Sequence, residues 1–340
     1  MNDRRYIIVL FLLVIAVIAM FCSRGRNRYF SHEGVVWTTD YHITYEASRD
    51  LGDSIQLILN NLDMSVSPYN TASLISALNE GKTASVDAYI RRLIEASMAI
   101  HKESGGAFDP TVMPLVNAWG FGYKNGNLPS SAQIDSILQF VGMDKIALQG
   151  DTLVKRDPRL MLDFSSIAKG MACDEIGRML ARNGAVNWLV EIGGEVMASG
   201  VNSRGTAWQV SVDLPTDDQD GVSHESAMTL ALDSGAVATS GNYRKWRDEG
   251  GNRLSHIIDP RTGSSQTGTL LSVTVTAPDC MTADAWATAC MVMGENQVKN
   301  MMQGRNDLGV MTIAADTVSG SLIVWSNAAF ADRITPTTQQ

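Results

Sequence analysis

The sequence predicts one α+β domain with mostly antiparallel strands and packed helices, preceded by an N-terminal signal or anchor segment. Two observations support this fold class. The helical and β-like segments do not alternate regularly enough for a doubly wound sheet, and no repeat period is present. The chain has 340 residues, of which 45% are hydrophobic and 19% charged, so it can bury a substantial core.

The N-terminus differs from the rest of the chain. Arg4 and Arg5 precede an apolar run over 6–21, and Cys22 ends this run. A spanning helix needs ~20 apolar residues, so two interpretations stay open: a lipoprotein signal with acylation at Cys22, or an uncleaved membrane helix. In both cases we expect residues 1–30 to be signal peptide or membrane anchor, with the protein at the cell membrane and facing the periplasm. The domain then spans 31–334, and 335–340 form a disordered tail.

Charge and cysteine content exclude several classes of protein. The formal net charge is -9, and no basic run follows the N-terminal region, so we expect no nucleic-acid partner. Beyond Cys22 the cysteines are Cys173, Cys280 and Cys290, without CxxC spacing. Neither a disulfide framework nor a zinc site is indicated, and we expect these thiols to be buried as small apolar groups.

Hydrophobic periodicity and turn residues predict the elements in order. In the first half we expect a strand, an amphipathic helix, a turn that presents Tyr69, a short helix that ends near Gly81, and a longer helix. In the second half we expect a helix, two short strands, a helix, two strands around Gly193-Gly194, and then further strands with one more helix between Ser255 and Cys290. The expected ranges are strands over 35–46, 208–214 and 230–239, helices over 52–63, 86–103, 130–141 and 173–183, and a strand pair around Ser319-Gly320.

The stretch from Ser255 to Cys290 carries the clearest chemical pattern. Asp284 and Thr288 are four residues apart, so on a helix their side chains lie on one face, one turn apart. A carboxylate and a hydroxyl, with room for waters and phosphate oxygens, suit Mg²⁺. The alternative is a helix-start aspartate with a packed threonine. His256 and Asp259 lie upstream in the same stretch, but as neighbours of Ser255 they cannot form a Ser-His-Asp triad.

Two other segments have the composition of ligand-binding loops. Gly105-Gly106 followed by Asp109-Pro110 allows close backbone approach and then fixes an extended turn. Asp163, Ser165 and Ser166 precede Lys169-Gly170, where free amides and a lysine can meet a pyrophosphate. The P-loop frame is absent, and the alternative is an N-cap serine pair with a solvated lysine. Tyr69 either stacks on a flat ligand or is a half-buried anchor.

Six motifs occur in one order along the chain: SGGAFDPTVMPLVNAWGFG, DFSSIAKG, LVEIGGE, ATSGNYR, SHIIDPRTG and CMTADAWATA. In these motifs, over roughly residues 35–330, the chain resembles the ApbE family of FAD:protein FMN transferases. The resemblance implies a single α+β domain and an exported enzyme, often a lipoprotein. It also implies Mg²⁺-dependent transfer of FMN from FAD to a threonine hydroxyl, with an acceptor protein in an exported or membrane redox complex.

The resemblance also implies site residues, position by position. His256 falls on the histidine that assists the threonine hydroxyl. The chain departs from the family at Trp37-Thr38-Thr39, where Met-Gly-Thr is usual, and at Leu74, where Glu is common. The implied metal ligands are Asp284, Thr288 and Ser166, and the implied FAD contacts are Trp37, Tyr69, Ala107, Phe108, Asp109, Asp163, Lys169 and Ile257.

Two other functions use the same residues. An Mg²⁺-dependent FAD pyrophosphatase would release FMN and AMP, with water as the nucleophile. A non-catalytic periplasmic FAD-binding protein would need only the pocket, and the Asp284 and Thr288 pair argues against it. A transferase must in addition exclude water from the FAD phosphorus until the acceptor supplies its hydroxyl.

Overall fold

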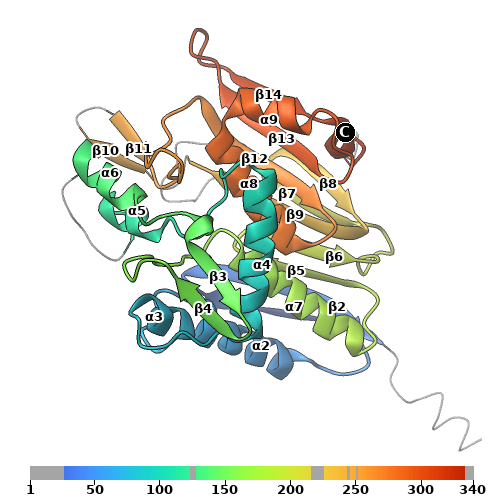
Figure 1. The fold of residues 1–340 in the computed structure, drawn as a ribbon. Coiled ribbons are helices and arrows are strands. Elements are labelled where there is room, and N and C mark those ends of the chain that lie inside the picture. Colours follow the sequence, from blue (N-terminus) through green and yellow to red (C-terminus); the bar gives the residue numbers. More distant parts are fainter. Residues whose placement is uncertain (1–26, 123–127, 216–225, 243–245, 250–251, 334–340) are drawn as a thin grey trace, which may run out of the picture.

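A computed structural model describes residues 27–122, 128–215, 226–242, 246–249 and 252–333 of the chain. Its centre is an eight-stranded sheet in the order β1-β2-β5-β6-β9-β12-β13-β14 (Figure 1). Every neighbouring pair in this sheet is antiparallel. The predicted α+β class with antiparallel strands is therefore confirmed.

The strands of the central sheet are β1 (Arg28–Val36), β2 (Thr39–Ala47), β5 (Trp188–Ile192), β6 (Glu195–Ser199), β9 (Ser234–Gly241), β12 (Leu270–Ala277), β13 (Gly309–Ala315) and β14 (Leu322–Ser326). Three two-stranded sheets pair β3 (Ile146–Gln149) with β4 (Thr152–Lys155), β7 (Trp208–Asp213) with β8 (Ser226–Leu232), and β10 (Trp246–Glu249) with β11 (Asn252–Ser255). The helices are α2 (Gly52–Val66), α3 (Leu74–Asn79), α4 (Ala88–Glu103), α5 (Met113–Ala118), α6 (Ser131–Leu138), α7 (Ala168–Arg182), α8 (Cys280–Met293), α9 (Glu295–Met302) and α10 (Ala328–Ala331).

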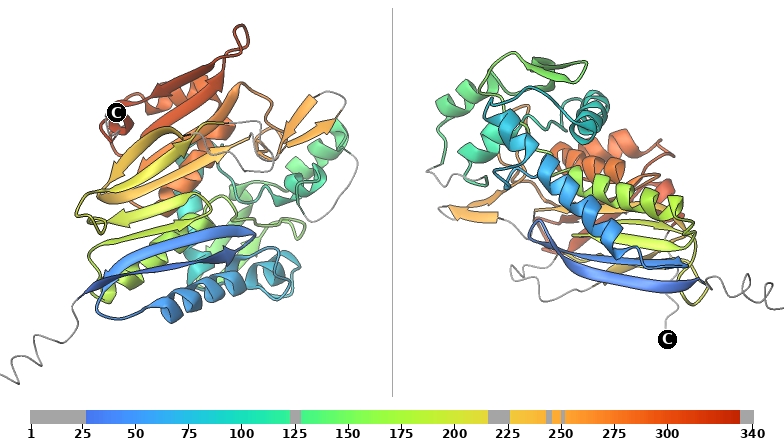
Figure 2. Two further views of the ribbon diagram at one scale, coloured as in Figure 1. Left: turned by 180° about the vertical axis from the view of Figure 1, so that it is seen from behind. Right: turned by 90° about the horizontal axis from the view of Figure 1, so that it is seen from below.

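The sheet separates two apolar layers. On one face α7 packs on β5 and β6, α8 packs on β9 and β12, and α2 lies against α7 (Figure 2). On the other face the β7–β8 pair covers Val196, Ala198 and Val237. Alternate residues of the same strands face the two layers, because side chains along a strand point to opposite sides.

Side chains cap the first turns of three helices, of which α4 and α6 begin close to the expected starts at 86 and 130. Asp87 caps α4 by accepting a hydrogen bond from Ile90 N, and Asp279 caps α8 in the same way from Thr282 N. Ser130 and Gln133 form a reciprocal capping box at α6. These side chains satisfy backbone donors that the first turn of a helix leaves unpaired.

The first strand prediction was wrong in one respect. Residues 35–46 do not form one strand, because the chain reverses at Trp37 and Thr38, whose φ angles are 50° and 64°. The result is the β1–β2 hairpin, in which Val36 pairs with Thr39. Strand β1 begins at Arg28, inside the segment expected to be signal or anchor. The apolar run over 6–21, Cys22 and the expected tail over 335–340 lie outside the described residues. Within the described residues, every helix is too short or too polar to cross a membrane.

A second correction concerns the expected strand over 230–239. It is two strands, because the chain leaves β8 in the outer layer and enters the central sheet as β9. Gly235 has φ 93°, and a Cβ there would lie 2.9 Å from the Ala277 carbonyl oxygen. Close packing of β9 on β12 therefore requires glycine at this point.

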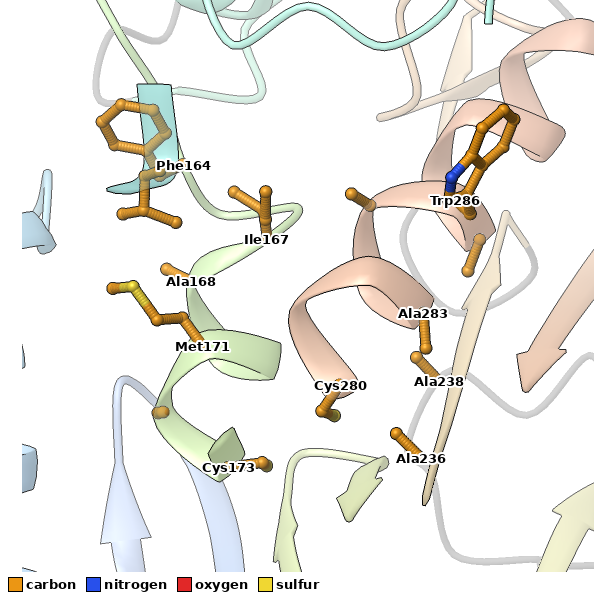
Figure 3. Packing of buried hydrophobic residues seen from close by; sticks show 14 of the residues in the cluster. Phe164, Ile167, Ala168, Met171, Cys173, Ala236, Ala238, Cys280, Ala283 and Trp286 are labelled. Carbon is orange, nitrogen blue, oxygen red and sulfur yellow. The ribbon is translucent and has the colours of Figure 1, made fainter. Parts of the chain in front are cut away.

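The helices α7 and α8 are joined at the start of α8. Asp174 of α7 accepts hydrogen bonds from Cys280 N at 2.8 Å and from Met281 N at 3.1 Å. The surrounding contacts are apolar, and Figure 3 shows Ala283 of α8 next to Ala238 of β9. Cys173, Cys280 and Cys290 are buried and free, as the sequence predicted.

Asp174→Ala tests how this link contributes to stability. Burial raises the pKa of Asp174 from 3.8 to about 6, although the two amide hydrogen bonds oppose the shift. The folded state therefore holds the Asp174 proton more tightly, and this stabilisation is complete below pH 3.8 and is lost as the pH rises through about 6. The destabilisation by Asp174→Ala should thus be largest near pH 4 and shrink by roughly 2–3 kcal/mol at pH 7.

Urea unfolding at both pH values measures this difference. Asp135→Ala removes an exposed carboxylate from α6 and is the control. A loss that is equal at the two pH values, or larger at pH 7, would contradict the raised pKa.

Candidate functional site

Asp284 occupies the second turn of α8 and points at the start of α7. Its Oδ2 accepts a hydrogen bond from Gly170 N at 3.0 Å, and the residue is 4% exposed. Burial raises the pKa of Asp284, while the Lys169 ammonium and the Gly170 amide oppose the shift. Among the described residues, Gly170 N is the one hydrogen-bond donor to this carboxylate. Its other oxygen is therefore available to a ligand.

The approach of α7 to α8 depends on Gly170. A Cβ at this position would lie 2.3 Å from the Cys280 carbonyl oxygen and 2.8 Å from Met281 Cα. Both atoms belong to the backbone, so no side-chain rotation can relieve the clash. The glycine brings its own amide to Asp284 and places Lys169, the preceding residue, beside the same carboxylate.

Lys169 makes an ion pair with Glu195, the first residue of β6. The Lys169 Nζ to Glu195 Oε1 distance is 2.5 Å. Glu195 is 3% exposed, and its Oε2 is buried without a hydrogen-bond partner. Burial raises the pKa of Glu195 to about 8, although Lys169 opposes the shift. Burial lowers the pKa of Lys169. The charges of Asp284 and Glu195 raise it by more, so the pKa of Lys169 lies above that of an ordinary lysine.

These three groups form a cluster that suits a cation. When all are ionised, two carboxylates and one ammonium leave one negative charge in a buried place, which is costly unless it is neutralised. Thr288 lies one turn after Asp284 and is half-buried, as is Ser166 before α7. Within the described ranges, no three His, Cys, Asp or Glu side chains group as metal ligands. The oxygens of Asp284, Thr288 and Ser166 are hard donors, the kind that suits Mg²⁺, which takes few protein oxygens and keeps waters or phosphates.

The residues expected to contact the flavin are partly brought together. Trp37 Nε1 donates a hydrogen bond to Asp63 Oδ1 at 3.1 Å, and Asn70 Nδ2 donates to the other oxygen of Asp63 at 2.6 Å. This joins the β1–β2 turn to the turn that presents Tyr69, which is 68% exposed. Partial burial of the hydroxyl and the nearby Asp163 carboxylate raise the pKa of Tyr69. An open aromatic ring thus lies close to the segment that leads into α7.

Asp163 is held beside the Asp109-Pro110 turn. Its amide donates to the Pro110 carbonyl at 2.7 Å, and its Oδ1 accepts from Ser165 N at 2.9 Å. Burial raises the pKa of Asp163, while the Ser165 hydrogen bonds oppose the shift. The two loops that the sequence marked as ligand-binding are therefore adjacent.

Three expected cofactor residues face inward. Ala107 and Phe108 are buried, with Phe108 only 1% exposed, so any ligand contact there uses the backbone. The Asp109 carboxylate accepts from Thr111 and from Met143 N. Burial raises its pKa, and the Thr111 hydrogen bonds oppose the shift. Asp109 thus fixes the loop, and with His101 and Arg261 it lines a cavity of about 320 Å³.

His256 is the half-buried residue between the buried Ser255 and Ile257. Phe121 packs edge-on against its ring, with centroids 6.4 Å apart. Both carboxylate oxygens of the nearby Asp259 accept hydrogen bonds from Arg261, at 2.9 and 2.8 Å. Beyond the histidine, Gln266 Nε2 donates to the Val292 carbonyl at 2.9 Å, which ties this loop to the end of α8.

Known proteins resemble this chain over the region that contains the six motifs. The sequence profile of the ApbE family matches residues 37–312. The chain belongs to the ApbE family. Relatives of this ApbE-family chain include the FAD:protein FMN transferase of Haemophilus influenzae, 31% identical over 93% of this chain and 95% of the relative. The Escherichia coli K12 protein of the same name is 32% identical over 85% of this chain and 83% of its own length.

Solved ApbE structures have the same fold. The flavin transferase ApbE from Vibrio cholerae superposes with a TM-score of 0.79 at 29% identity, covering 91% of this chain and 100% of the other. The apo form of the Pseudomonas stutzeri flavinyl transferase ApbE gives 0.79 at 29% identity, covering 90% and 97%. The ApbE fold therefore extends over nearly all of the described chain.

Two residues, Glu195 and Gly170, build this ApbE site through contacts that the sequence did not predict. Glu195 lies in the LVEIGGE motif, directly after Gly193-Gly194, and the motif was its one available signal. Gly170 lies in DFSSIAKG, where we expected free amides for a pyrophosphate. Its amide instead donates to Asp284, and its packing against α8 has no sequence signature. Both depend on contacts with segments distant in the chain.

Gly170→Ala tests the helix contact. The added methyl must separate α7 from α8, so we expect a loss of about 1–3 kcal/mol or more in unfolding free energy, as for an overpacked core. Thermal and urea unfolding measure it. Gly304→Ala is the matched control, because a Cβ there meets nothing within 4 Å. Equal stability of the two variants would contradict the close contact.

Proposed function

We propose that this chain transfers FMN from FAD to a threonine hydroxyl of an acceptor protein in an Mg²⁺-dependent reaction. The support is its membership of the ApbE family, together with relatives over most of its length that are named FAD:protein FMN transferase. The observation that carries the metal dependence is the buried Asp284 carboxylate. Among the described residues it accepts one hydrogen bond, from Gly170, and it is buried beside the Lys169–Glu195 ion pair.

The Asp284 carboxylate, the Thr288 hydroxyl and an oxygen of Ser166 would hold the Mg²⁺. When bound, this ion would neutralise charge on the phosphate oxygens of FAD. We assign Mg²⁺ because these donors are hard oxygen atoms, which lie on one face of α8 and in the loop beside it.

The residues of the chain supply the remaining steps. The Lys169 side chain is 28% exposed at the start of α7, and its ammonium can bind a pyrophosphate oxygen. His256 accepts the proton of the threonine hydroxyl as the new oxygen–phosphorus bond to the FMN phosphate forms. The phosphorus–oxygen bond to the AMP phosphate breaks, and AMP leaves with the electron pair.

Tyr69 and Trp37 are the residues that would cover the flavin. The exposed ring of Tyr69 can stack on the isoalloxazine, and Trp37 is fixed near it through Asp63. Covering the site keeps water from the phosphorus until the acceptor docks. Exclusion of water is what distinguishes a transferase from a pyrophosphatase with the same metal, because the pyrophosphatase uses water as its nucleophile.

We also propose that the N-terminal segment attaches the enzyme to the cell membrane, facing the periplasm, where exported or membrane redox proteins would be its acceptors. The motivation is the apolar run over 6–21 followed by Cys22. Fractionation of cells that express Cys22→Ser distinguishes the two anchors. Release from the membrane indicates acylation, and retention indicates an uncleaved helix.

The function is tested with the full-length chain in detergent, FAD, Mg²⁺ and candidate exported acceptors. Flavin fluorescence on a denaturing gel should appear on an acceptor and should depend on its threonine. Asp284→Ala should abolish labelling, because the metal loses its one charged ligand. Rapid release of FMN and AMP without acceptor, and no labelled protein, would favour the pyrophosphatase instead.

His256→Ala should slow transfer by about 10²–10⁴-fold, the usual effect of removing a general base. FAD affinity, measured by quenching of flavin fluorescence, should change little, because the histidine acts on the acceptor hydroxyl. His101→Ala is the comparison variant, because it alters the cavity lined by His101, Asp109 and Arg261. Parallel losses of FAD affinity and rate in His256→Ala would make the residue part of the FAD pocket.

A further inference from the structure

Glu195 is attached to α7 at two points. Lys169 Nζ lies 2.5 Å from Glu195 Oε1, and Cys173 Sγ donates to the Glu195 carbonyl at 3.3 Å. Residues 169 and 173 are one helical turn apart, so both contacts lie on one face of α7. The hairpin position of Glu195 is fixed in turn by Gly193, whose amide donates to the Asp40 carbonyl at 2.9 Å.

The Lys169 ammonium interacts electrostatically with two carboxylates, those of Glu195 and Asp284. It makes a direct ion pair with Glu195, and within the described part of the chain it makes none with Asp284. Asp284 nevertheless interacts with Lys169 and with Glu195 through their charges. Lys169 therefore lies next to the cation site without occupying the Asp284 carboxylate.

We propose that Glu195 is a positioning residue that holds the Lys169 ammonium away from Asp284 and thereby sets the divalent-cation affinity of the site. This inference rests on the proposed function, because it assumes that Asp284 binds the metal. Glu195 reaches the metal only through Lys169 and through its own charge, and it need not be a ligand.

Three physical consequences follow. Without the Glu195 charge, the flexible lysine can pair with Asp284, and the cluster becomes neutral, so a divalent cation binds weakly. Without the Lys169 charge, two carboxylates remain, and the cation binds tightly. Without both charges, the single negative charge of the native cluster is restored. In a buried site these charge changes are weakly screened by solvent.

The test measures Mn²⁺ binding to the full-length chain in detergent, by the electron paramagnetic resonance signal of free Mn²⁺, without FAD. A pH of 8.5 under argon lies above the raised Glu195 pKa of about 8, so most of the Glu195 carboxylate is ionised. We expect Glu195→Gln to weaken Mn²⁺ binding about tenfold or more, and Lys169→Met to tighten it by a similar factor. The double variant should return close to the wild-type affinity.

Glu191→Gln is the matched control. Glu191 lies in the same β5–β6 hairpin, but it pairs with His42 and accepts from Gly194 N, so its loss should leave Mn²⁺ affinity unchanged. Circular dichroism and melting temperature verify that each variant is folded. The double variant separates charge from architecture, because a structural defect in Glu195→Gln would not be corrected by a second substitution.

The outcomes are distinct. Wild-type affinity in both single variants, or no recovery in the double variant, would overturn the inference and leave the proposed function intact. Absence of Mn²⁺ binding to the wild-type chain, with and without FAD, would overturn both the inference and the metal dependence of the proposed function.

Discussion

The site depends on the contact between α7 and α8 at Gly170. Two helix backbones approach so closely that even a methyl group would meet the Cys280 carbonyl at 2.3 Å. The contact aligns an amide donor with Asp284 and sets Lys169 beside it. Asp174, further along α7, holds the first amides of α8. The carboxylate that we assign to the metal is thus oriented by a helix far away in the sequence.

Four acids of the motifs are buried or half-buried. Asp284, Glu195, Asp163 and Asp109 all have raised pKa values, and burial is the largest cause for each. Buried charges rarely stabilise a fold relative to apolar residues of similar size. The two carboxylates beside Lys169, Asp284 and Glu195, therefore point to function, since a bound cation or nucleotide can compensate a buried charge that the protein leaves uncompensated.

The acids in the ApbE motifs are of two kinds: some use their carboxylates in hydrogen bonds within a loop, and others keep an oxygen for a ligand. The Asp109 carboxylate accepts hydrogen bonds from Thr111 and Met143, and the Asp259 carboxylate accepts hydrogen bonds from Arg261. These acids shape loops. Asp284 and Glu195 each keep an oxygen without a hydrogen bond from the described residues. Residues of equal prominence in the sequence thus differ in their availability to a ligand.

The sequence by itself determined the α+β class, most helices and the one-turn spacing of Asp284 and Thr288, because these depend on local periodicity, capping and spacing. Asp284 and Thr288 are one turn apart in any helix, and Asp279 caps that helix from its own loop. The motif order likewise determined the family. Tertiary structure alone decided that 35–46 turns back at Trp37 and Thr38, that 230–239 is divided between two sheets, and that Glu195 meets Lys169. These features arise from contacts between segments distant in the chain, and local sequence does not specify which distant partner a strand or a charge will find.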